Sequence, residues 1–87
     1  MTKHERNQLL KRLAKVEQEG CARLEELSKQ KPESDEAQEA LARKAFWLAK
    51  VLGGVTVVQI NLQWGDYDEG MRKSVKTLEG LLNDDKT

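Results

Sequence analysis

The residue types that usually carry chemistry are scarce in this chain of 87 residues, which has one cysteine, Cys21, and one histidine, His4. Nucleophilic catalysis needs a serine or cysteine held beside a base. The pattern around Cys21, however, places it on the packing face of a helix, and His4 lies close to the amino terminus. One cysteine and one histidine also provide neither a disulfide nor a ligand set for structural zinc. We therefore predict a protein that is not an enzyme and that uses no metal or cofactor.

The glycines and carboxylates lead to the same expectation. Gly53 and Gly54 are followed by valine and threonine, and no lysine stands where a phosphate-binding loop would need one. Carboxylates are plentiful, but nearly all of them have a lysine or arginine at helical spacing, which pairs opposite charges on a helix surface. We interpret them as solvated helix faces.

The charge balance argues against nucleic acid as the default partner. Lysine plus arginine number 15 and aspartate plus glutamate number 15, so the formal net charge is +0 and no overall basic field attracts phosphate backbones. The first 31 residues carry eight basic and five acidic residues, with no aromatic side chain on which a base could stack. We interpret this excess as a solvated surface. A nucleic-acid-binding regulator that uses Lys3 to Lys15 stays an alternative.

Composition and size favour one small helical domain over residues 1–87. Hydrophobic residues are 38%, charged residues 34% and aromatic residues 5% of the chain, which is typical of charged, soluble helices. A chain of this size buries only about 60% of its unfolded surface, so association is the expected source of additional stability. Residues 1–7 lead into no apolar run with a cleavage site, and we expect a cytoplasmic protein.

Pro32 separates two helical patterns. Before it, apolar and small residues recur at spacings of three and four, which predicts an amphipathic helix over residues 3–31. Gly20 in this helix allows close approach of another helix. Two acid-first pairs at a spacing of four support its exposed face. These pairs are Glu19 with Arg23 and Glu25 with Lys29.

A second helix is expected over residues 34–64, with Ser34 or Asp35 as its cap. Between Val51 and Gly65 the chain has no charged residue, and two periods compete there. Apolar and polar residues alternate from Val58 to Trp64 as they do in a strand, but a solitary strand would have no partner. We favour a helix, with a kink allowed at the glycine pair Gly53–Gly54.

The last predicted helix covers residues 66–83, with Asp66 or Asp68 as its cap and residues 84–87 as a frayed tail. Its inward positions are Met71, Val75, Leu78 and Leu82. Together the three segments predict an all-α fold, a three-helix bundle built on an antiparallel helical hairpin of the first two helices.

The candidate functional site is an apolar surface of the second helix, because its apolar residues surround more of the helix than two neighbours can cover. Aromatic residues often anchor interfaces, so we expect this surface to accept an amphipathic helix of a protein partner or of a second copy in a homo-oligomer. The alternative is that the flanking helices cover the surface. The candidate protein-binding residues are Phe46, Trp47, Val51, Val55, Val58, Leu62 and Trp64.

A membrane span over Ala45 to Trp64 is disfavoured. The twenty residues are long enough to cross a bilayer, but Lys50 lies inside the run and Gln59, Asn61 and Gln63 lie near its end. These polar groups are costly in lipid, and the other helices need this segment as their packing partner. We therefore predict a central helix of a soluble domain.

Two resemblances bear on function. The segment from Gly65 to Gly70, GDYDEG, with the following MRKSVKTLEGLL, resembles the turn and second helix of one tetratricopeptide repeat. The overall plan of a charged first helix, a polar turn and a more apolar second helix is similar to the small helical co-chaperones of type III secretion needle subunits. In that family the hairpin pairs with a repeat-containing chaperone and keeps a needle subunit soluble in the cytoplasm.

The resemblance therefore implies a non-catalytic protein-binding module, a small cytoplasmic chaperone or adaptor that shields an apolar helix of its partner. An alternative in the same broad class is a phage or mobile-element inhibitor that binds a host protein, since such inhibitors are often short, single-domain chains without catalytic motifs.

Overall fold

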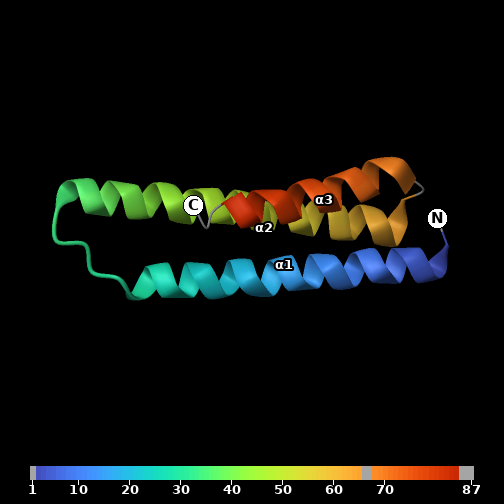
Figure 1. Cartoon of the computed structure of the whole chain (residues 1–87), viewed down its shortest axis with the longest axis horizontal. Helices are drawn as coiled ribbons and strands as arrows, with labels where there is room; N and C mark the ends of the chain where they lie inside the picture. The colour runs from blue at the N-terminus through green and yellow to red at the C-terminus, as the bar shows by residue number, and fades with distance from the viewer. Residues whose placement is uncertain (1, 66–67, 85–87) are drawn as a thin grey trace.

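Three helices form the computed structural model, which describes residues 2–65 and 68–84. Helix α1 spans Lys3–Lys29, α2 spans Asp35–Trp64 and α3 spans Asp68–Asp84. The first two helices form an antiparallel hairpin, and α3 folds back along the C-terminal half of α2 (Figure 1). Each helix contacts both others, and the molecule is elongated, with extents of 51 × 21 × 17 Å. The predicted all-α class and the packing of three helices are confirmed.

The helices begin and end where local chemistry satisfies the backbone. The hydroxyl oxygen of Thr2 accepts the Glu5 N–H at 3.1 Å, and that of Ser34 accepts the Ala37 N–H at 3.1 Å. Ser34 is therefore the cap of α2, one of the two residues expected. Helix α1 ends at Lys29, two residues earlier than predicted. The residue before a proline disfavours helical backbone, so the helix cannot include Lys31, and the extended C-cap Gln30 closes it by donating its N–H to the Leu27 carbonyl at 3.2 Å.

Helix α2 continues through the segment whose period was ambiguous. It runs as one helix past the glycine pair to Trp64, and the Gly65 N–H donates to the Asn61 carbonyl at 2.7 Å. The helical alternative is thus confirmed. A helix places Val51, Val55 and Val58 on one face, where they are buried, whereas a strand in this chain would leave its backbone groups unpaired.

The start and tail predicted for the last helix fall partly on residues 66–67 and 85–87, which lie outside the described residues. Within the described part, α3 extends to Asp84, one residue beyond the predicted end. Its expected inward positions are confirmed. Val75, Leu78 and Leu82 are buried, and Met71 packs partly buried against them.

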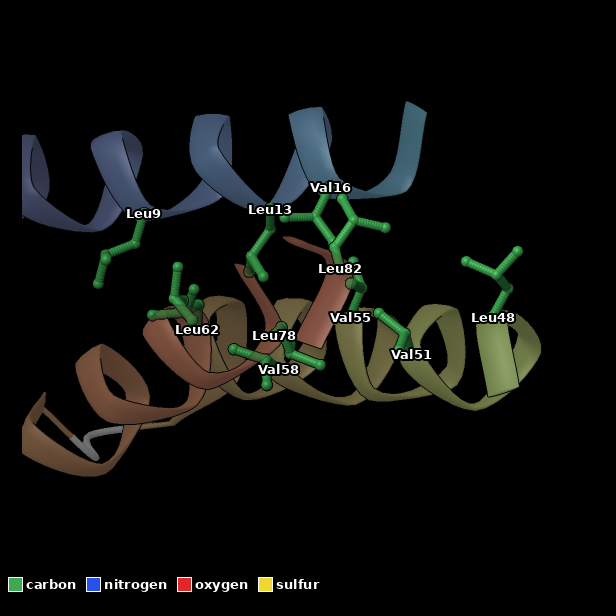
Figure 2. Packing of buried hydrophobic residues seen from close by; sticks show 11 residues of the cluster. Leu9, Leu13, Val16, Leu48, Val51, Val55, Val58, Leu62, Leu78 and Leu82 are labelled. Atoms are coloured by element: carbon green, nitrogen blue, oxygen red, sulfur yellow. The ribbon is translucent and has the colours of Figure 1, made fainter. Parts of the chain in front are cut away.

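One continuous apolar core lies between the three helices (Figure 2). Figure 2 shows the α1 side chains of Leu9 and Leu13 pointing toward α2 and α3. Among the described residues, no polar or charged residue is buried with them, so burial of apolar area is the main stabilising term. The core residues are Leu9, Leu13, Val16, Leu48, Val51, Val55, Val58, Leu62, Val75, Leu78 and Leu82.

Two glycines let the helix axes approach. A Cβ added at Gly20 of α1 would lie 2.9 Å from Cδ2 of Leu52 on α2, and one added at Gly54 of α2 would lie 2.9 Å from Cδ2 of Leu78 on α3. The predicted close approach at Gly20 is therefore confirmed. Leu78 is 7% exposed and has little room to move, so Gly54 is the tighter of the two crossings.

We predict that Gly54→Ala lowers the free energy of unfolding by about 1 kcal/mol. The new methyl group overpacks the α2–α3 crossing, typically at a loss of about 1–3 kcal/mol, which exceeds the gain in helix propensity of about 1 kcal/mol. The matched control is Gly80→Ala, because a Cβ there meets nothing within 4 Å and should stabilise α3. Urea unfolding measures both, and equal stabilisation by the two substitutions would contradict the tight crossing.

Candidate protein-binding surface

The structure separates the seven candidate residues into two groups. Val51 is 3%, Val55 0%, Val58 7% and Leu62 2% exposed, and all four belong to the core between the helices. Their assignment to an exposed contact face is therefore corrected. The reason is geometric: they lie on one side of α2, and α1 and α3 together cover that side.

Phe46 and Trp64 lie on the opposite side of α2, with exposed fractions of 64% and 85%. Trp47 lies between the two groups, half-buried against the edge of the core. Two exposed residues were missing from the candidate site, namely Val57 at 58% and Ile60 at 53%. Val57 lies eleven residues after Phe46 and Ile60 lies four residues before Trp64, and this helical spacing was the signal that could have identified them.

Seven exposed residues of α2 form one continuous strip, which we call the outer stripe. With 3.6 residues per turn, they fall within a sector of about 80° centred opposite the core, and the strip is about 33 Å long. Ala42, Ala49 and Gly53 are small, whereas Phe46 and the last three residues of the strip have large apolar side chains. The outer stripe consists of Ala42, Phe46, Ala49, Gly53, Val57, Ile60 and Trp64.

The outer stripe is nearly uncharged. From residue 40 to residue 65 the chain has no aspartate or glutamate, and Lys50 borders the stripe with its Nζ 5.0 Å from the centre of the Phe46 ring. This cation–π contact holds the ammonium group over the aromatic face, where it shields little of the remaining apolar surface. A ligand of this surface must therefore be mainly apolar.

A second surface lies at the open end of the hairpin. Helix α3 ends partway along α2 (Figure 1), where Arg23 of α1 donates from Nη1 to the Leu82 carbonyl and from Nη2 to Glu19 at 2.7 Å. Beyond this point α1 and α2 enclose two shallow cavities of about 470 and 340 Å³. Leu27 and Lys44 line both cavities, so a groove continues between the two helices where α3 no longer covers them.

Ion pairs between helices fix α3 on α1. Arg12 donates from Nε to Glu79 Oε2 at 3.0 Å and from Nη2 to Oε1, and Arg72 donates to Glu5. The hydrogen bonds from Arg12 lower the pKa of Glu79 below its usual range, and the same bonds raise the pKa of Arg12. Along α1, the expected Glu19–Arg23 pair is confirmed at 2.7 Å.

The second expected pair on α1 is also present, with Lys29 Nζ 3.9 Å from Glu25 Oε1. Cys21, in contrast, is exposed and does not lie on the packing face expected for it. The packing face of α1 passes through its neighbour Gly20, which is buried. Among the described residues, no group of three or more histidine, cysteine, aspartate and glutamate side chains is arranged to hold a metal ion.

Comparison with known proteins adds no relative. No protein-family model, no curated protein and no solved structure matches the chain. By length and composition alone, α2 is apolar enough to cross a membrane, as core helices of soluble proteins also are. A function for this chain is therefore inferred from its architecture and from these two surfaces.

We predict that Glu79→Gln lowers the free energy of unfolding at pH 7 by less than about 1 kcal/mol, because the Arg12–Glu79 pair is partly exposed. The folded state lowers the pKa of Glu79, so the stabilisation is present above the ordinary carboxyl pKa and is lost as pH falls from about 5 through the lowered value. Urea unfolding at a series of pH values should show the difference between variant and wild type shrink in acid. Glu25→Gln is the control, since its pair lies within α1. A difference that is independent of pH would contradict the role of this pair.

Proposed function

We propose that the protein is a non-catalytic protein-binding module, a small cytoplasmic chaperone or adaptor that covers an apolar helix through the outer stripe of α2. The observation that carries the proposal is the exposure of four large apolar side chains on one face of one helix. Phe46, Val57, Ile60 and Trp64 are each more than half exposed.

The area of this surface supports a binding role. Judged from their exposed fractions, the four large side chains present about 500 Å² of apolar surface to solvent. Contiguous apolar patches of more than a few hundred Å² are rare on soluble monomers and often mark interaction sites. Because α1 and α3 pack on the other side of α2, nothing within the described chain covers this area.

The shape of the surface favours a helix as the ligand. The outer stripe is straight, long and narrow, and its middle is low because Ala49 and Gly53 have small or no side chains. A Cβ placed on Gly53 would meet nothing within 4 Å, so there is open space above the backbone at this point. An apolar helix face laid along the stripe would fill this depression with its side chains.

The architecture is consistent with the type III secretion co-chaperones that the sequence resembles. The protein shares with them a charged first helix, a polar turn and a more apolar second helix in an antiparallel hairpin. The groove at the open end of the hairpin, lined by Leu27 and Lys44, supplies a second surface on which a larger chaperone can pack.

We predict that the double substitution Val57→Gln and Ile60→Gln weakens partner binding by roughly tenfold or more. A few residues near the centre of an interface carry most of its binding energy, and these substitutions replace two apolar ones by polar amides. Both side chains are exposed, so the helical fold should persist, as circular dichroism would verify. The purified, tagged chain serves as bait. The measurement is the amount of each native-host protein that it retains, together with the amount of an untagged copy of the same chain that it retains.

The matched control for this experiment is Thr77→Gln, which changes another exposed β-branched residue, on α3, to the same amide. Hydroxyl-radical labelling of Phe46 and Trp64 should be lower in the wild-type complex than in the free wild type. Labelling of the free Thr77→Gln variant should equal that of the free wild type. Retention of every bound protein by the double variant at the wild-type level would contradict the proposed function.

A further inference from the structure

The residues of the outer stripe are arranged symmetrically about Gly53. Ala49 and Val57 lie four residues on either side of it, and Phe46 and Ile60 lie seven residues on either side. The two ends of the stripe, Ala42 and Trp64, lie eleven residues on either side. A strip with this spacing maps onto itself when the helix direction is reversed about Gly53.

We infer that the partner of the outer stripe is a second copy of this chain, and that two α2 helices pack antiparallel about a two-fold axis at Gly53. This inference rests on the proposed function, because both assign protein binding to the outer stripe. A two-fold interface requires a surface that is complementary to itself, which is the property that the spacing confers.

Side-chain sizes match in this register. Trp64, the largest and most exposed residue of the stripe, faces Ala42 of the second copy, so its ring has space over a small side chain. Phe46 faces Ile60, which places a ring against a branched aliphatic side chain at each end of the interface. In a parallel pairing Trp64 would face Trp64 and Ala42 would face Ala42, which leaves one end crowded and the other with a gap.

The centre of the register allows close contact of the two backbones. Gly53 faces Gly53 on the axis, and Val57 faces Ala49 one turn away. Since a Cβ on Gly53 has no neighbour within 4 Å, the α2 helix of the second copy can approach Gly53 without displacing any side chain around it. The stripe repeats every eleven residues, a period of about 3.67 per turn, so nearly straight helices stay in contact along its length.

Charge also favours the antiparallel register. Lys50 lies three residues before Gly53 and therefore faces Thr56 of the second copy, whose side chain is polar and uncharged. The two Lys50 side chains are then offset by about 9 Å along the helix axis. A parallel pairing would place them opposite each other with no carboxylate between residues 40 and 65 to neutralise them.

The buried area is adequate for a dimer. The four large side chains present about 500 Å² per protomer, and the small residues and side-chain stems of the stripe raise this to about 700 Å². Stable protein–protein interfaces bury about 600–1,000 Å² per partner, so the whole stripe must take part. The interface leaves the groove at the open end of the hairpin uncovered, because the groove is lined by Leu48 on the inner side of α2 and by Leu27 of α1.

The first test is the oligomeric state. Light scattering on a sizing column, over a tenfold range of concentration, should give a dimer for the wild type. Val57→Arg places a charge against Ala49 of the second copy and should raise the dissociation constant about thirtyfold or more. Thr77→Arg, an exposed substitution on α3, should leave the dimer intact, and circular dichroism verifies that both variants stay helical.

The second test is the register. In a Cys21→Ser background, Gly53→Cys should form a disulfide-linked dimer under mild oxidation, because the two residues meet on the axis. Ala49→Cys alone should cross-link poorly, and Ala49→Cys with Val57→Cys in the same chain should cross-link well. Gly80→Cys, exposed on α3, is the control that should not cross-link.

Defined outcomes overturn this inference. If the wild type is a monomer at all concentrations, the dimer is refuted. If that monomer also binds a different protein and loses this binding in the Val57→Gln and Ile60→Gln variant, the proposed function stays intact. A dimer that persists in Val57→Arg would place self-association elsewhere. Co-sedimentation of a monomeric wild type with phosphatidylcholine and phosphatidylglycerol vesicles, abolished by Val57→Arg, would assign the stripe to a lipid surface instead.

Discussion

Packing of both other helices on the inner face of α2 is the interaction on which the whole structure depends. Leu48, Val55 and Leu62 are buried on this face over four turns, and the apolar sides of α1 and α3 converge on it. Burial of this area supplies the main free energy of folding in a chain without a disulfide and with no buried polar residue among those described. The glycines at the two crossings, Gly20 and Gly54, set how closely the axes can approach.

The unequal lengths of the helices determine where surface is left over. Helix α3 has 17 residues and α2 has 30, so α3 can cover only part of the hairpin. A groove therefore stays open at one end between α1 and α2. The outer side of α2 is left uncovered for a different reason: α1 and α3 pack on one side of it, and no described part of the chain packs on the far side.

The sequence predicted much of the fold because local signals and apolar spacing agreed. Ser34 was one of two expected caps, Pro32 separated α1 from α2, and the apolar positions of α3 all face the core. The predicted end of α1 at Lys31 was two residues too late, because apolar spacing does not include the restriction that Pro32 places on the residue before it. The exposed position of Cys21 was missed because Cys21 and its buried neighbour Gly20 both fitted the apolar spacing.

The candidate site was predicted less well than the fold. The sequence identified α2 as a helix with more apolar residues than its neighbours can cover, and Phe46 and Trp64 are indeed exposed. Helical spacing places Val51, Val55, Val58 and Leu62 on the opposite face of α2, but spacing along one helix does not show which of its two apolar faces the other helices will cover. Val57 and Ile60 were left out for the same reason.

Periodicity and capping chemistry are local, so the sequence by itself determined three helices, their approximate ends and which residues share a face. Only the tertiary structure decided which face of α2 becomes core, because that choice depends on where α1 and α3 meet it. The helix axes approach closely at Gly20 and Gly54, where glycine has no side chain. The outer face of α2 stays exposed because neither α1 nor α3 reaches it. Both conditions arise from residues far apart in the chain, which spacing along one helix does not encode.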